Sequence, residues 1–97
     1  MAEQSKTIAR RVRIEGRVQG VWFRGWTVDR ARALQLCGWV RNLSDGSVEA
    51  VFAGPKRAVL TMIEACRRGP PNAIVERLSE EPIEAAKFED FRQLPTG

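Results

Sequence analysis

The residues best suited to chemistry lie in a glycine-flanked loop near the N-terminus that ends in an arginine. This segment reads Gly16-Arg17-Val18-Gln19-Gly20-Val21-Trp22-Phe23-Arg24. It follows a stretch with strand periodicity and precedes one with helical periodicity. Loop and first-turn N–H groups in such a place lack intrahelical partners, and the helix dipole favours negative charge. Arg24 adds a planar guanidinium that can bind two phosphate oxygens at once. The loop is therefore a candidate anion site, although its spacing matches neither a Walker A motif nor a dinucleotide-binding fingerprint.

The charge distribution and the absence of histidine narrow the chemistry further. The 97 residues carry a net charge of +4, with the excess between Lys6 and Arg24 and a net acidic last third. A basic region favours an anionic ligand: nucleic acid, an acidic membrane surface or a small phosphate compound. A chain without histidine has no histidine base and no histidine-ligated metal. Neither Cys37 nor Cys66 precedes an arginine at the spacing of a thiolate phosphate loop. We expect no metal and no cofactor, and any catalysis must rest on arginine, amides, backbone groups and carboxylates.

The hydrophobic pattern predicts the elements that position this loop. Strands are expected over residues 7–15, 39–43, 48–52, 73–79 and 88–94. A helix is expected over about 23–36, with Phe23, Thr27, Ala31 and Leu34 inward and Gly38 as its C-terminal glycine. A second helix is expected to begin at Gly54-Pro55, to bury Val59, Met62, Ile63 and Cys66, and to end before Gly69. Residues 80–86 read as an acidic connection.

The order β-α-β-β-α-β indicates an α+β fold, with a mostly antiparallel sheet and two helices on one face. Parallel crossovers are right-handed, so the first two strands should run the same way and end at the same edge of the sheet. This arrangement would place the loop of residues 16–20 near Asn42, which is about twenty residues away in the sequence. It is the one place where distant residues are expected to converge on a basic loop.

At this point the residues resemble a known family. The segment from Gly16 to Arg24 resembles the first signature of the acylphosphatases. Gly38-Trp39-Val40-Arg41-Asn42, continued by Asp45-Gly46-Ser47-Val48, resembles the second. The resemblance covers nearly the whole chain; Leu43 departs from it, because a small polar residue commonly follows the asparagine there.

The resemblance implies a ferredoxin-like α/β sandwich and metal-independent hydrolysis of the carboxyl–phosphate bond of acyl phosphates. It implies that Arg24 binds the substrate phosphate and that Asn42 orients the attacking water. The phosphate cradle then falls on Gln19, Gly20, Val21, Trp22, Phe23 and Arg24. Such chemistry suits this chain because a carboxylate, whose parent acid has a pKa of about 4, leaves without a general acid. The partners would be an acyl phosphate as substrate and inorganic phosphate as product.

Two other functions share the predicted topology. An RNA-binding module would need exposed aromatic side chains on the central strands. The first strand has none, and Phe52 has the parity of a buried residue. A ligand-sensing regulatory domain is the other alternative, but such domains are usually attached to something they regulate. The three tryptophans could form a base-stacking platform, although core or rim packing is the simpler reading.

The remaining features predict the setting of the protein. We expect a disordered leader over residues 1–6 and a single domain over 7–97. The N-terminus lacks the apolar region of a secretory signal, and no apolar run is long enough to span a membrane. Cys37 and Cys66 read as free thiols in a reducing compartment, with a single bridge between them as the alternative. We therefore expect a cytoplasmic monomer that binds neither membrane nor nucleic acid.

Overall fold

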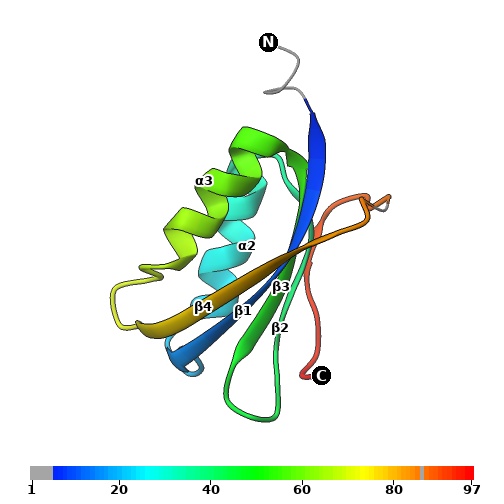
Figure 1. Cartoon of the computed structure of the whole chain (residues 1–97). Coiled ribbons are helices and arrows are strands. Elements are labelled where there is room, and N and C mark those ends of the chain that lie inside the picture. The colour runs from blue at the N-terminus through cyan, green and yellow to red at the C-terminus, as the bar shows by residue number, and fades with distance from the viewer. Residues whose placement is uncertain (1–5, 86) are drawn as a thin grey trace.

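The protein is described by a computed structural model that covers residues 6–85 and 87–97. The leader expected over residues 1–6 therefore lies, for residues 1–5, outside the described residues. Five strands and two helices occur in the described part of the chain. They are β1 (Thr7–Arg17), α2 (Phe23–Ala33), β2 (Cys37–Asn42), β3 (Val48–Pro55), α3 (Lys56–Cys66), β4 (Ile74–Ile83) and β5 (Phe91–Gln93) (Figure 1).

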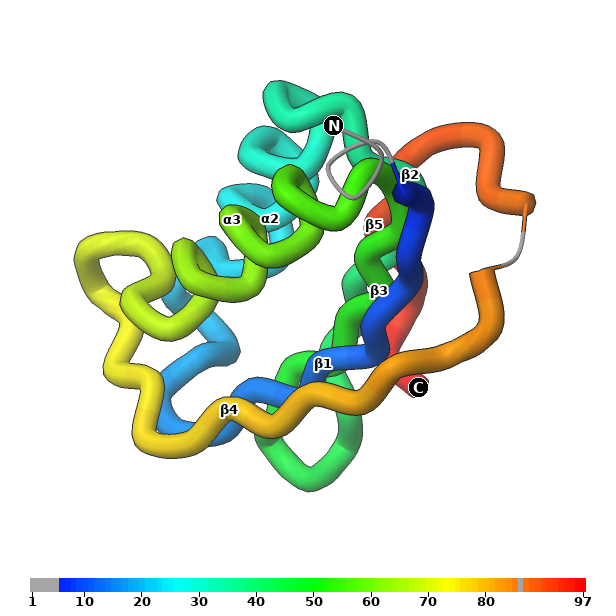
Figure 2. The backbone as a smooth tube through the Cα atoms, turned by 45° about the horizontal axis from the view of Figure 1, so that its top comes forward, coloured from blue at the N-terminus to red at the C-terminus, as the bar shows by residue number. Residues whose placement is uncertain are grey.

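The strands form one sheet in the order β4-β1-β3-β2-β5. All neighbouring pairs are antiparallel except β2 and β5, which are parallel. Both helices lie on the same side of this sheet, as Figure 2 shows. The predicted α+β fold with a mostly antiparallel sheet and two helices on one face is confirmed. Because β1 and β2 each run antiparallel to β3, they run in the same direction and end at the same edge.

The core forms between the helices and the sheet, as the periodicity predicts. The apolar stripe of α3, which consists of Val59, Met62, Ile63 and Cys66, is buried. Helix α2 buries Phe23, Thr27 and Ala31 as expected, and also Trp26 and Val28. The Thr27 hydroxyl satisfies its hydrogen-bonding need by donating to the Phe23 carbonyl oxygen at 2.8 Å. Burial raises the pKa of the Cys66 thiol to about 12.

The end of α2 differs from the prediction. The helix ends at Ala33, and Gln35 takes the left-handed position expected of a glycine, with φ 59°. Gly38 lies instead inside β2, where a Cβ would be 1.9 Å from the Val51 carbonyl oxygen. The expectation that Gly38 closes the helix is therefore wrong, because its lack of a side chain serves strand packing. Similarly, Pro55 ends β3 and precedes α3 rather than lying in its first turn.

The acidic connection expected over residues 80–86 is also wrong for its first part. Residues 80–83 belong to β4, which pairs with β1 as far as Ile83 opposite Ala9. Arg10 forms an ion pair with Glu80 at 3.2 Å, and Arg11 forms one with Glu81 at 2.6 Å. The charges that looked like a solvated linker thus lie across from the arginines of the neighbouring strand. Much of the basic excess of β1 is neutralised in this way.

No helix in the described ranges is long and apolar enough to cross a membrane.

Candidate active site

The connection between β1 and α2 is shorter than the predicted loop of residues 16–24. Gly16 belongs to β1, has φ 126° and lies at a register shift in the pairing with β4. A Cβ at residue 16 would lie 2.2 Å from the Ile74 carbonyl oxygen. Gly16 therefore permits the bulged pairing of two strands, and the free loop consists of residues 18–22.

The loop leads into a helix whose first turn is open to an anion. Trp22, with φ 66° and ψ 26°, is the N-cap of α2, and no side chain makes a capping hydrogen bond there. The first turn holds no acidic residue. Gly20 has φ 75°, and the space into which a Cβ would point contains no described protein atom within 4 Å. The N–H groups of the first turn have no intrahelical acceptors, so they remain available to an anion.

A cleft of about 180 Å³ lies at this helix end. Its lining residues are Val18, Gln19, Gly20, Trp22, Phe23, Arg24, Gly25, Asn42 and Gln93. The structure thus brings together Arg24 and Asn42, as the strand directions predict. Val21 is not in the lining; it is half-buried and packs against the core. Gln93, which the sequence analysis missed, enters through β5, because this strand lies beside β2.

Arg24 and Asn42 are both half-buried. Within the described part of the chain, Arg24 forms no ion pair and neither side chain makes a hydrogen bond to protein. Asn42 ends β2 opposite Val48, and its backbone carbonyl accepts a hydrogen bond from the Gly97 N–H at 2.9 Å. The backbone of Asn42 is therefore held on two sides, while its amide and the Arg24 guanidinium are left for a ligand.

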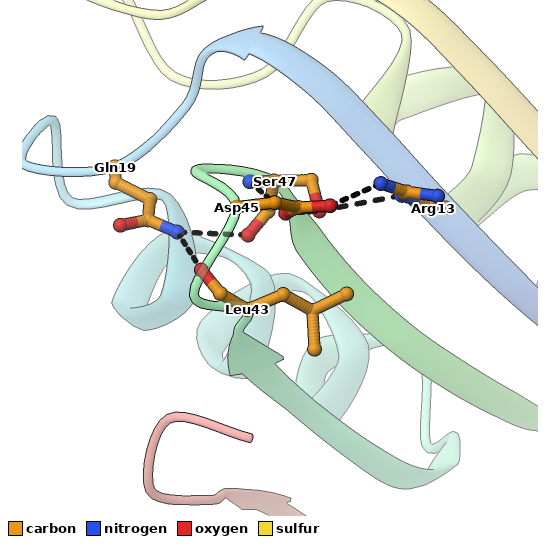
Figure 3. Close-up of polar contacts among 5 residues, drawn as sticks. All are labelled: Arg13, Gln19, Leu43, Asp45 and Ser47. Carbon is orange, nitrogen blue, oxygen red and sulfur yellow. Dashed lines mark hydrogen bonds and ion pairs between the residues drawn. The ribbon is translucent and has the colours of Figure 1, made fainter.

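A hydrogen-bonded tether joins the loop to the β2–β3 hairpin. The side-chain amide of Gln19 donates to the carbonyl oxygens of Leu43 and Ser47, each at 2.8 Å (Figure 3). Gln19 therefore connects the two segments that supply Arg24 and Asn42. Gln19 was predicted to belong to the phosphate cradle through the amides of its loop, and it lines the cleft while its side chain bonds to the hairpin.

The hairpin turn is itself held by a polar cluster next to Gln19 (Figure 3). The N–H and hydroxyl of Ser47 donate to one Asp45 carboxylate oxygen at 2.9 and 2.6 Å. Arg13 forms an ion pair with Asp45 and donates to the Ser47 hydroxyl oxygen at 3.3 Å. The hydrogen bonds from Ser47, together with the nearby Arg13, lower the pKa of Asp45.

Of the other candidates, Trp22 lines the cleft, whereas the other two tryptophans, Arg17 and Arg41 do not. Arg41 pairs with Glu49 at 2.8 Å, and its guanidinium lies 5.1 Å from the ring centroid of Trp39. Arg17 is exposed and does not line the cleft. Trp26 packs in the core, whereas Trp22 is 62% exposed.

A wider groove of about 510 Å³ lies between the two helices, with Trp26, Arg30, Arg57, Leu60 and Arg68 among its lining. None of the predicted site residues lines this groove. The smaller cleft is the candidate site, because unpaired first-turn N–H groups, the Arg24 guanidinium and the Asn42 amide lie together there.

Comparison with known proteins finds acylphosphatases both by sequence and by structure. Residues 10–93 match the family model described as Acylphosphatase. A protein named acylphosphatase from Rhodospirillum rubrum is 55% identical over 85 residues, covering 88% of this chain and 93% of its own. One from Rhizorhabdus wittichii is 50% identical over 95 residues, covering 98% and 96%. The solved structure of an acylphosphatase from Coxiella burnetii superposes with a TM-score of 0.88 at 39% identity, covering 91% of this chain and 93% of that one.

Proposed function

The chain belongs to the acylphosphatase family and hydrolyses acyl phosphates, and we propose that Arg24, Asn42 and the first turn of α2 carry out this reaction. The observation that supports the proposal best is that these three groups line one cleft although Asn42 comes from β2 and the other two come from α2. The sequence resemblance implies a phosphate-binding role for Arg24 and a catalytic role for Asn42.

In this proposal the phosphoryl group lies at the N-terminus of α2. The backbone N–H groups of residues 19–24 donate to its oxygens, and the Arg24 guanidinium binds two of them at once. Because Arg24 forms no ion pair in the described ranges, its charge is not already neutralised by the protein. These donors stabilise the charge that spreads over the phosphoryl oxygens in the transition state.

Asn42 orients the attacking water. Its amide oxygen accepts a hydrogen bond from the water and its NH₂ group donates to the substrate. The water oxygen forms a bond to phosphorus, and the bond between phosphorus and the acyl oxygen breaks. The carboxylate leaves without protonation, since its parent acid has a pKa of about 4. An amide is too weak a base to take the proton of water, so a phosphate oxygen receives it. The products are a carboxylate and inorganic phosphate.

We also propose that the enzyme works as a monomer in the cytoplasm and does not bind nucleic acid. Both cysteines are free thiols, which fits a reducing compartment. The large apolar side chains exposed in the described residues, Trp22, Leu60 and Ile74, come from three different segments. Phe52 is fully buried and cannot stack on a base. Size-exclusion chromatography with light scattering measures the oligomeric state; a stable dimer would contradict this part of the proposal.

The test of the mechanism is hydrolysis of benzoyl phosphate, followed by the loss of ultraviolet absorbance, with and without EDTA. We expect the same rate in both, because the proposed machinery consists of arginine, amide and backbone groups. Inorganic phosphate should inhibit competitively and raise the melting temperature by mass action. Activity that EDTA abolishes and magnesium restores would refute the proposal.

A further inference from the structure

Trp22 is an exposed aromatic residue at the edge of the active-site cleft. Its side chain is 62% exposed, more than the other large apolar side chains exposed in the described ranges, Leu60 at 40% and Ile74 at 56%. Of these three, Trp22 is the one that lines the cleft with Arg24 and Asn42. Exposure of an indole costs hydrophobic free energy, so its position beside a binding site suggests a ligand contact.

The backbone of Trp22 is in an unfavourable conformation for its residue type. It has φ 66° and ψ 26°, the left-handed region, which bulky side chains rarely occupy. A glycine would adopt this conformation freely, as Gly20 does two residues earlier with φ 75°. The chain nevertheless carries its largest type of side chain at this position.

Gly25 provides the space in which the indole lies. A Cβ at residue 25 would be 2.1 Å from the Trp22 Nε1 atom and 2.7 Å from its Cδ1 atom. The indole therefore rests directly on the backbone of α2, over its first turn. Glycine destabilises a helix relative to alanine. Its presence at residue 25 is explained by the indole, because a Cβ there would overlap the ring. Trp22 and Gly25 are thus each unfavourable for their local backbone, and together they hold the indole against the first turn of α2.

The cleft is too small to enclose a whole acyl phosphate, so the acyl group is the part of the substrate that the indole can contact. Sites that enclose drug-sized ligands measure about 300–1,000 Å³, whereas this cleft measures about 180 Å³. Once a phosphoryl group occupies the first-turn N–H groups and Arg24, the acyl group has to extend toward the mouth. An indole that is seated on the helix there offers a flat apolar surface to that group.

From these observations we propose that the Trp22 side chain is the acyl-group contact of this enzyme and favours acyl phosphates with an aromatic acyl group. The inference rests on the proposed function, because it assigns the other end of the same substrate. Aromatic rings that meet in stacked or edge-to-face geometry gain more than their buried area supplies, whereas a methyl group makes little such contact. Trp22 is thus a specificity-determining residue: its N–H belongs to the phosphate cradle, and its ring selects the acyl group.

The experiment compares kcat/KM for benzoyl phosphate with kcat/KM for acetyl phosphate in the wild type and in variants. Trp22→Ala should lower the benzoyl-to-acetyl ratio about tenfold, and Trp22→Phe should restore most of it. Gly25→Ala, which favours the helix but displaces the indole, should lower the ratio in the same direction. Ile74→Ala, which removes an exposed apolar side chain that does not line the cleft, is the control and should leave the ratio unchanged.

The ratio separates this inference from the function on which it rests. A wild-type enzyme that hydrolyses neither compound would overturn the proposed function and this inference with it. Variants at Trp22 and Gly25 that hydrolyse both compounds with the wild-type ratio would overturn the inference alone. A Trp22→Ala enzyme that loses both activities equally would also overturn it, because that result indicates a structural role. If Trp22→Ala does not fold, the Gly25→Ala ratio decides.

Discussion

The side-chain amide nitrogen of Gln19 lies 2.8 Å from the carbonyl oxygen of Leu43, the residue that follows Asn42. The same nitrogen lies 2.8 Å from the Ser47 carbonyl oxygen at the other side of the hairpin turn. One amide group thereby sets the separation between the loop of residues 18–22 and the end of β2. Because the loop leads to Arg24 and the strand ends at Asn42, this contact fixes the distance between the two proposed functional side chains.

Replacement of Gln19 should therefore impair catalysis through geometry. We expect Gln19→Ala to lower kcat/KM about tenfold, because a small misplacement of a positioned group is costly. It should also lower the free energy of unfolding by about 1–3 kcal/mol, since two hydrogen bonds are lost while both carbonyl oxygens keep a backbone N–H donor. Gln19→Glu should be worse, because a carboxylate faces two carbonyl oxygens. Steady-state kinetics and thermal melts measure both effects, with Asn72→Ala as the exposed-amide control. A Gln19→Ala enzyme with wild-type values would rule out the tether.

Arg24→Ala should weaken both substrate binding and the transition state. Loss of a bidentate charge-assisted contact predicts a fall in kcat/KM of roughly 100-fold, and weaker competitive inhibition by phosphate. Arg24→Lys should recover only part of the lost kcat/KM, because a single ammonium group cannot reproduce the two parallel hydrogen bonds of the planar guanidinium. The measurements are kinetics and phosphate binding, with circular dichroism to establish folding. Unchanged phosphate affinity in folded Arg24→Ala would remove the central element of the proposal.

Asn42→Ala should fail differently. It should lower kcat about 100-fold while KM rises much less, because orientation of water is lost and most phosphate contacts remain. The inhibition constant of inorganic phosphate provides the comparison within the same variant. If folded Asn42→Ala keeps a kcat near that of the wild type, another group positions the water.

The Asp45 cluster predicts a pH dependence of stability. The pKa of Asp45 is lower in the folded protein than its usual value near 3.9. Its stabilising contribution is therefore complete above about pH 5 and is lost as the pH falls through the lowered folded pKa. Asp45→Asn should melt at a lower temperature than the wild type at pH 7, and the two melting temperatures should converge in acid. Thermal melts between pH 2 and pH 7 test this; a constant difference across that range would contradict it.

The sequence alone was sufficient for the architecture. The apolar spacing of α3, the Asp45-Gly46 turn and the glycine-bounded loop before Phe23 are local signals, so each element could be predicted from its own residues. The rule that crossovers are right-handed then placed Asn42 beside the loop. Family resemblance added the proposed water-orienting role of Asn42, which no local pattern indicated, and for Arg24 it agreed with the anion site that the loop itself indicated.

Tertiary structure decided the features whose partners lie far away in the sequence. Residues 80–83 are mostly polar and were therefore predicted to be a linker. They form part of β4 because they pair with β1, whose arginines form ion pairs with Glu80 and Glu81. Gly38 looked like a helix end, although the reason for a glycine there is the Val51 carbonyl of the next strand. Gln93 reached the cleft only because β5 pairs with β2. The side-chain directions of Gln19 and Trp22 likewise depend on the hairpin and on the space above Gly25. Hydrophobic periodicity indicates which side chains of a segment are buried and which face water. Contacts between strands and loops depend instead on which segments lie side by side in the folded chain.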